Sequence, residues 1–196
     1  MLLEMKTERL ILRPYVLNDA PYAQKLGDDK AVAETTFIPY PYTLEKVESW
    51  IGNHSSLIEN GDAYPLAVIL KSGMKLIGTM TIRVDKIHNK GELAYWIGKN
   101  FWGKGFATEA SRRILEFGFN VLNLNRIWAP VMSKNKASGK VMEKVGLKYE
   151  GTLKQDVLRW DKYEDVDVYG LLKKDFNQMM NNKQSTDAMQ QSGVLP

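Results

Sequence analysis

The chain has 196 residues, of which 44% are hydrophobic and 26% charged, and it contains no cysteine. This size and balance predict one globular domain and exclude a disordered or fibrous protein. The lack of cysteine excludes disulfides, thiolate metal sites and cysteine nucleophiles. The N-terminal segment has an acid at Glu4 and no continuous apolar run, and no stretch approaches the ~20 apolar residues of a membrane span. We therefore expect a cytoplasmic protein with no membrane partner.

The chain is basic, with a net charge of +4 and an isoelectric point near 9.1. Its basic residues are interleaved with acidic ones, and only short pairs such as Arg112-Arg113 and Lys173-Lys174 occur. A nucleic-acid-binding protein more often gathers basic residues on one face. We expect no nucleic-acid partner. The charge is compatible with a small polyanionic ligand, although solubility alone explains it more simply.

The first part of the chain predicts one strand followed by helices. Residues 9–13 form a short strand of roughly alternating apolar residues. A first helix begins at a cap formed by Asn18 or Asp19, because side chains of this kind accept hydrogen bonds from the first helical turn. A second helix runs from Thr43 to Gly61, and a loop with two prolines separates the two helices.

The middle of the chain changes to strands and then to an amphipathic helix. Three apolar or alternating segments, 64–70, 76–84 and 91–97, are separated by turn residues, so we expect an antiparallel meander. The segment 101–110 then leads into a helix that starts near Ala107. Its apolar residues recur at helical spacing and form one stripe: Ala107, Ala110, Ile114, Phe117, Gly118 and Val121.

The last part predicts a strand over 125–132, a helix over 136–144 and two strands near 147–153 and 164–172. The whole pattern indicates an α/β (α+β) fold, with a mixed, mostly antiparallel central sheet of about seven strands flanked by helices. The strand–helix–strand crossover in its centre should join two parallel strands. We expect one domain over residues 1–177. Residues 178–196 offer little to bury and are expected to form a flexible C-terminal tail.

Two glycines, Gly103 and Gly105, lie between a strand and the amphipathic helix. Glycine allows positive φ, so successive N–H groups there can turn toward one anion, and the helix N-terminus adds further donors. A phosphate site and a plain structural turn are both compatible with this pattern. The loop is not a dinucleotide fingerprint, because Thr108 occupies the place of the third glycine.

The segment Trp102–Ala110 resembles the coenzyme-A loop of the GNAT superfamily of N-acetyltransferases, especially the ribosomal-protein (RimJ/RimL-like) branch, which acetylates protein N-termini. Three further segments agree with this branch in order and spacing: Thr7–Arg13, Gly91–Ile97, and Asn135–Ser138 followed by Glu143–Leu147. The resemblance covers about residues 7–172. It implies the GNAT acyl-CoA N-acyltransferase fold and acetyl-CoA as co-substrate.

The resemblance also implies which residues bind the co-substrate. Pantetheine would lie between two parallel strands that splay apart, and a backbone N–H near Ile97 would face the thioester carbonyl. Pyrophosphate would bind the amides of the glycine loop. Asn135 would contact the pantetheine arm, although it could also act only as the cap of its helix. The residues implied in binding are Trp96, Ile97, Gly98, Gly103, Lys104, Gly105, Phe106, Ala107, Thr108, Asn135 and Ser138.

For the amine, Glu92 is the first candidate for the general base, because it lies on the strand that leads into the glycine loop. A surface glutamate on an alternating strand is the alternative interpretation. Asp156 and Asp85 are weaker candidates. His54 and His88 are expected to be solvated and not involved.

The departing thiolate lacks the usual acid. Many GNAT enzymes carry a tyrosine that reprotonates it, whereas this chain has Met142 at that position, which cannot donate a proton. In its own branch the serine, here Ser138, is a suspected substitute. A thiol with a pKa near ~8.5 can also leave as the thiolate. Tyr95 and Trp96 are expected to form the core or the cleft wall.

The resemblance therefore implies that the protein transfers an acetyl group from acetyl-CoA to a primary amine by direct attack. The acceptor is a protein N-terminus or a small-molecule amine, and the sequence does not choose between them. No pair of histidines or clustered carboxylates has metal-ligand spacing, so we expect no metal. A non-catalytic acetyl-CoA sensor or scaffold and a nucleic-acid module are the alternatives. We expect a monomer or a homodimer.

Overall fold

The computed structural model describes the backbone of residues 3–191 and the side chains of residues 3–182. Eight strands form one sheet in the order β1-β2-β3-β4-β5-β6-β8-β7. The strands are β1 (Met5–Lys6), β2 (Leu10–Pro14), β3 (Ala63–Leu70), β4 (Lys75–Asp85), β5 (Lys90–Ile97), β6 (Arg126–Met132), β7 (Lys148–Arg159) and β8 (Lys162–Leu172). This confirms the mixed, mostly antiparallel sheet; the short β1 raises the number of strands from about seven to eight.

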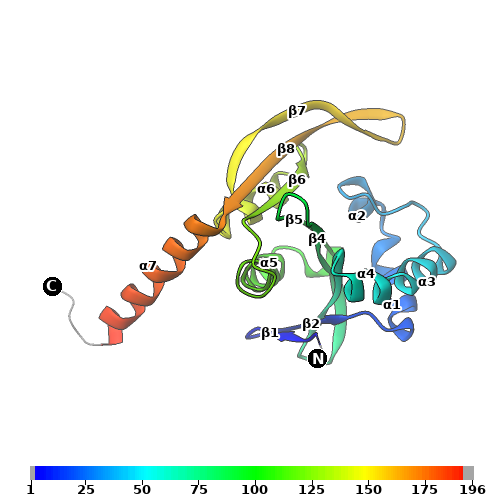
Figure 1. Cartoon of the computed structure of the whole chain (residues 1–196). Coiled ribbons are helices and arrows are strands. Elements are labelled where there is room, and N and C mark those ends of the chain that lie inside the picture. Colours follow the sequence, from blue (N-terminus) through cyan, green and yellow to red (C-terminus); the bar gives the residue numbers. More distant parts are fainter. Residues whose placement is uncertain (1–2, 192–196) are drawn as a thin grey trace.

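Helices cover both faces of this sheet (Figure 1). The helical segments are η1 (Leu17–Asp19), α1 (Ala20–Gly27), α2 (Lys30–Glu34), α3 (Leu44–Gly52), α4 (His54–Asn60), η2 (Lys99–Phe101), α5 (Phe106–Glu116), its π-helical continuation η3 (Phe117–Val121), α6 (Lys136–Lys144) and α7 (Lys173–Gln191). Among the described residues, no helix is long and apolar enough to cross a membrane.

Alternation along the strands produces two apolar cores, one on each face of the sheet. On β2, Leu10 and Leu12 belong to the core that packs against α5, α6 and α7, whereas Ile11 packs against the core beneath α1, α2 and α3. In the first core the stripe of α5 supplies Ala110 and Ile114, both fully buried. The amphipathic pattern therefore positions α5, whose N-terminus carries the glycine loop.

Strand β5 pairs with β6 in parallel over three residues only, from the Lys90–Arg126 pair to the Glu92–Trp128 pair. Every other neighbouring pair of strands in the sheet is antiparallel. Beyond Glu92 the two strands separate, so the backbone of β5 from residue 93 onward lacks a neighbour on that side. This opening lies next to the start of α5 and α6.

Three predicted features differ in the structure. The helix expected over residues 43–61 is two helices, α3 and α4, which meet at Asn53. Asp19 precedes α1, but its carboxylate accepts hydrogen bonds from Arg13 and from the Val16 amide instead of capping the helix. The β7–β8 hairpin is longer than predicted. The outer parts of its two strands pair with each other, and they show no apolar alternation from which the sequence could predict a strand.

Residues Lys173–Gln191 form a helix, and this helix includes the first part of the tail that was expected to be flexible from residue 178. Helix α7 begins directly after β8 and extends away from the sheet (Figure 1). Its first turns pack on the domain: Phe176 is buried and stacks on Phe119 with ring centroids 4.7 Å apart. Met179 lies against Gly146, and Met180 packs on the core. The domain contacts therefore extend past the predicted boundary at residue 177.

Candidate active site

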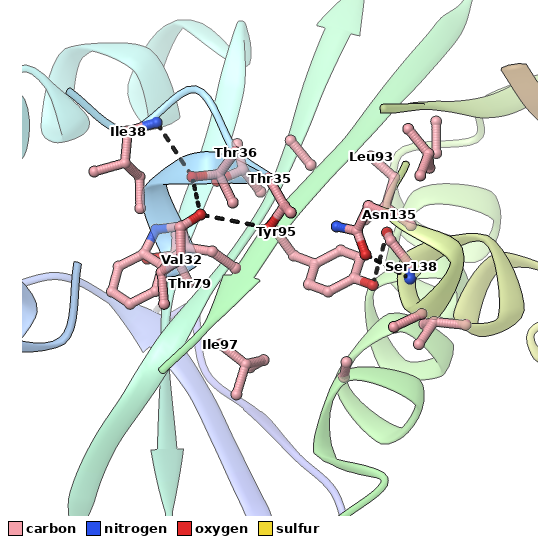
Figure 2. Close-up of a pocket in the computed structure, with 18 of the residues that line it drawn as sticks. Val32, Thr35, Thr36, Ile38, Thr79, Leu93, Tyr95, Ile97, Asn135 and Ser138 are labelled. Atoms are coloured by element: carbon pink, nitrogen blue, oxygen red, sulfur yellow. Dashed lines mark hydrogen bonds between the residues drawn. The ribbon is translucent and has the colours of Figure 1, made fainter. Parts of the chain in front are cut away.

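A cavity of about 650 Å³ lies along β5, open to both faces at the point where β5 and β6 separate. Its wall contains the glycine loop and the start of α5, one side of α6 along its length, residues of β5 and β6, and the α2–α3 region on the opposite side. Figure 2 shows this arrangement, with Val32, Thr35 and Thr36 on one side of the strands and Asn135 and Ser138 on the other. One continuous cavity therefore joins three of the four segments that the resemblance singled out, and the segment Thr7–Arg13 lies outside its wall.

The glycine loop has the backbone of an anion site. Gly103 and Gly105 have φ of +72° and +79°, in the left-handed region that favours glycine. Within the described residues, none of the backbone N–H groups of residues 103–108 donates a hydrogen bond to the protein, and α5 begins at Phe106. These free donors at a helix N-terminus fit a pyrophosphate.

The side chains of β5 alternate between the two faces of the sheet. Glu92, Ala94 and Trp96 pair with Arg83, Thr81 and Thr79 of β4 and point to the same face as those partners, toward α2 and α3. Leu93 and Tyr95 point to the other face, toward α5 and α6. The strand therefore presents Glu92 on one side of the opening and Tyr95 on the other.

The N–H of Ile97 points into the opening between β5 and β6. Gly98 donates its N–H to the Ile77 carbonyl of β4, and successive residues of a strand direct their backbone groups to opposite edges. The Ile97 carbonyl, on the same edge as its N–H, accepts a hydrogen bond from Nε1 of Trp102. An N–H in this place can stabilise negative charge on an oxygen bound in the opening.

Asn135 and Ser138 meet Tyr95 at the start of α6. The Asn135 side chain accepts a hydrogen bond from the Ser138 amide at 3.1 Å, so it caps the helix as the alternative interpretation proposed. The hydroxyls of Tyr95 and Ser138 are 2.9 Å apart (Figure 2). Burial raises the pKa of Tyr95, although the hydrogen bond with Ser138 acts in the other direction. Tyr95 therefore not only forms the cleft wall, as expected, but also contacts the Ser138 hydroxyl.

Glu92 lines the cavity and forms an ion pair with Arg83 on the neighbouring strand. Arg83 donates to Oε1 of Glu92; within the part of the chain that the structure describes, Oε2 has no hydrogen-bond partner. Among the described residues, Glu92 is also the one carboxylate in the cavity wall. Asp85 and Asp156, the weaker candidates for a base, are not in that wall.

Two predicted binding residues do not line the cavity. Gly98 packs against Leu26, so its role is to allow close contact between β5 and α1. The side chain of Lys104 turns back to donate to the Asn100 carbonyl and lies over the ring of Phe101. The other predicted binding residues are in the cavity wall: Trp96, Ile97, Gly103, Gly105, Phe106, Ala107, Thr108, Asn135 and Ser138.

The expectation for His54 was wrong, whereas His88 is exposed in a turn as predicted. His54 is only 2% exposed and packs edge-on against Trp50 with ring centroids 4.2 Å apart. Neither ring nitrogen has a hydrogen-bond partner among the described residues. Burial lowers the pKa of His54 to about 4, so the ring is neutral at physiological pH. The break between α3 and α4 turns His54 inward, which the sequence pattern did not show.

Sequence reasoning also missed two contributors to the site. Tyr95 reaches Ser138 from 43 positions away in the chain, and the sequence contains no local signal for this contact. Arg83 became relevant only through its pairing with Glu92 across β4 and β5. Within residues 3–182, no group of three potential ligands among His, Cys, Asp and Glu is arranged to hold a metal ion.

Comparison with known proteins assigns this arrangement to a family. The profile of the acetyltransferase (GNAT) domain matches residues 9–148. An N-acetyltransferase of Bacillus licheniformis, uncharacterized and called p20, is 33% identical over 172 residues, which cover 87% of this chain and 96% of that protein.

Two solved structures show the same fold. The ribosomal-protein-S5-alanine acetyltransferase of Vibrio fischeri superposes with a TM-score of 0.79 at 21% identity, covering 89% of this chain and 98% of that one. The spermidine N-acetyltransferase of Vibrio cholerae, in complex with CoA and spermine, gives a TM-score of 0.75 at 23% identity, covering 87% and 99%. The chain belongs to the GNAT family and is an N-acetyltransferase that takes its acetyl group from acetyl-CoA.

Proposed function

We propose that the enzyme acetylates its amine by direct attack, with Glu92 as the general base and Ser138 at the departing sulfur. The observation that carries this proposal is the single cavity that joins the free amides of the glycine loop, the Ile97 N–H, the Ser138 hydroxyl and Glu92. In such a cavity the thioester and the amine approach from opposite faces of β5.

The reaction balances with these groups. Glu92 takes a proton from the ammonium, directly or through one water, and the freed nitrogen lone pair attacks the thioester carbonyl carbon. The carbonyl oxygen gains the negative charge and accepts a hydrogen bond from the Ile97 N–H. When the carbon–sulfur bond breaks, the thiolate accepts a hydrogen bond from Ser138, whose hydroxyl Tyr95 orients. The amide nitrogen loses its remaining extra proton to solvent.

The acceptor side of the cavity favours an amine without further positive charges. Its wall between α2 and α3 is apolar and aromatic, with Ile38, Tyr42 and Trp50, and the charged residues there are Lys46, Arg83 and Glu92. Buried cations need carboxylate partners, and the single carboxylate is already paired with Arg83. A polyamine or an aminoglycoside would bring several cations into this site. We therefore favour a protein N-terminus as the acceptor over a polyamine or an aminoglycoside. We also propose that the enzyme is cytoplasmic.

A panel of acceptors tests this assignment. Peptides with an apolar N-terminal residue, the same peptides with an added N-terminal lysine, and spermidine are incubated with acetyl-CoA, and release of free CoA is followed. We expect kcat/KM for the apolar peptides to exceed that for spermidine by at least about 100-fold, which corresponds to ~2.7 kcal/mol. Equal or faster acetylation of spermidine would overturn the acceptor assignment while leaving acetyl transfer itself intact.

A further inference from the structure

The N-terminal strands reach the glycine loop through one glutamate. Glu109, in the first turn of α5, accepts hydrogen bonds at Oε1 from the Thr7 hydroxyl and from the Arg9 backbone N–H at 2.8 Å. Its Oε2 accepts a hydrogen bond from Nε of Arg9 at 2.6 Å. The segment 7–13 and the segment 102–110, which the sequence analysis singled out separately, are therefore joined at one carboxylate.

The other end of Arg9 holds the loop itself. Nη1 donates to the Lys104 carbonyl at 3.1 Å, and the guanidinium lies over the Phe106 ring, 4.6 Å from its centroid. Arg9 is not in the wall of the cavity. The planar guanidinium thus bridges Glu109 and the loop from behind, with its orientation fixed at several points.

This contact sets the direction of one loop amide. In a planar trans peptide, the carbonyl of one residue and the N–H of the next point to opposite sides. Because Arg9 holds the Lys104 carbonyl behind the loop, the Gly105 N–H points away from Arg9, toward the cavity that Gly105 lines. The positive φ of Gly105 then continues the chain into α5, whose first amides are also free.

Arg9 and Glu109 also balance each other in charge beside the anion site. Burial opposes ionisation of Glu109, but hydrogen bonds from Thr7 and Arg9 outweigh it and hold the pKa of Glu109 below its ordinary range. A lone carboxylate in the first turn of α5 would repel a bound pyrophosphate. With the Arg9 guanidinium in contact, the pair is neutral and the loop amides act unopposed.

We propose that Arg9 is a positioning residue for the pyrophosphate of acetyl-CoA: by holding the Lys104 carbonyl it aims the Gly105 N–H at the anion. This inference rests on the assignment of the glycine loop to the pyrophosphate. Arg9 does not itself touch the reacting atoms, so it acts on the affinity for the co-substrate and not on the chemical step.

The test compares Arg9→Gln and Arg9→Lys with wild type in two measurements. Calorimetry gives the Kd for CoA, and steady-state kinetics give kcat/KM with S-acetylpantetheine, which has the thioester but lacks the pyrophosphate. We expect Arg9→Gln to weaken CoA binding at least tenfold and to leave kcat/KM for S-acetylpantetheine within twofold. Arg9→Lys keeps the positive charge but loses the planar guanidinium with its several donors, so it should weaken CoA binding about fivefold or more.

Arg113→Gln is the matched control. It removes an arginine from α5, the helix that Arg9 contacts through Glu109, with the same change in net charge and the loss of an ion pair to Glu116, at a site outside the cavity wall. Its Kd for CoA should stay at the wild-type value. If Arg9→Gln fails to fold, Arg9→Lys carries the test, because it keeps the positive charge beside Glu109 and should weaken CoA binding in the same selective way.

Several results would overturn the proposal. These are an unchanged Kd for CoA in folded Arg9→Gln, wild-type affinity in Arg9→Lys, or an equal loss with CoA and with S-acetylpantetheine. The last result would mean that Arg9 supports the fold in general. Failure of wild type to bind CoA through this loop is a different outcome, because Gly105 variants would then also be without effect.

Discussion

His54 packs among aromatic rings, and neither ring nitrogen has a partner in the part of the chain that the structure describes, although the sequence indicated a solvated position. A buried polar group without hydrogen bonds costs free energy, and a charged imidazole there would cost far more. The expectation of a solvated His54 was wrong because of one local feature. The pattern of residues 43–61 fits one continuous helix, and only the break at Asn53 turns His54 toward Trp50 and Tyr15.

The first prediction concerns pH and stability. The folded pKa of His54 is lowered to about 4 from 6.5, so the unfolded chain binds a proton first as the pH falls. The free energy of unfolding should therefore be constant above pH 6.5 and decrease between pH 6.5 and 4, by at most about 1.4 kcal/mol per pH unit. His54→Phe should abolish this decrease between pH 7 and 5 in urea unfolding. A variant with the wild-type slope would contradict the assignment.

The second prediction concerns Glu92. Glu92→Gln keeps the shape of the side chain but cannot take a proton, so kcat/KM should decrease by ~10²–10⁴-fold while the affinity for CoA holds. Wild type should lose activity at low pH, and this loss should disappear or shift in the variant. Glu116→Gln, on the outer side of α5, is the control and should retain wild-type rates. If Glu92→Gln keeps both the rate and the pH profile, water or another group deprotonates the amine.

At the scale of elements, the periodic segments were predictable and the contacts between them were not. The meander β3–β5, the amphipathic α5 and the short α6 are confirmed, because the strands are apolar or alternating runs between turn residues and the helices each have one apolar face. Helix α7 has only a short stripe, formed by Phe176, Met179 and Met180, and the outer part of β7 is largely exposed. Hydrophobic pattern carries no information about elements that bury little.

The glycine loop allows a prediction with a close control. Gly105→Val places a β-branched residue at φ +79°, so the loop must rearrange, and calorimetry should show at least tenfold weaker CoA binding, or ~1.4 kcal/mol. Gly73→Val introduces the same side chain at the same φ of +79°, in the turn between β3 and β4. It should lower stability comparably but leave the affinity for CoA unchanged. Equal affinities in the two variants would refute the loop assignment.

Helix α7 allows a prediction from two truncations. Met179 and Met180 pack against Gly146 and the core, so removing residues 179–196 should lower the free energy of unfolding by roughly 1–3 kcal/mol. Removing residues 183–196 keeps both methionines, and the melting temperature should then stay close to the wild-type value. Affinity for CoA should be unchanged in both, because α7 does not line the cavity. A large loss in the shorter truncation would place a stabilising contact beyond residue 182.

Across the whole molecule, the C-terminal hairpin contacts the segment between α2 and α3, which lines the cavity. Arg159, at the tip of β7, donates Nη2 to the carbonyls of Ala33 and Ile38, both at 2.6 Å. Next to it, the rings of Trp160 and Tyr40 lie 5.9 Å apart. Ile38 lines the cavity on the side of α2 and α3, where we propose that the amine binds. Residues more than 120 positions apart in the chain are thus in contact and hold the loop around Ile38 in place. No local sequence pattern could predict this contact.

The last prediction tests this contact. Arg159→Met keeps an apolar stem but removes the donors, and hydrogen bonds to a charged group contribute about 1.5–3 kcal/mol. The loop around Ile38 should then loosen, so KM for the amine should rise roughly tenfold while the Kd for CoA stays the same, because the glycine loop lies at the other end of the cavity. Lys162→Met is the control at the hairpin tip, since the Lys162 side chain is exposed and its ion pair with Glu164 is long, at 3.7 Å. Steady-state kinetics with the amine varied at saturating acetyl-CoA, together with calorimetry of CoA binding, separate the two effects. An unchanged KM for the amine in Arg159→Met would show that the loop holds its place without the hairpin, and an equal loss of CoA affinity would show that the contact supports the whole cavity and not its acceptor side.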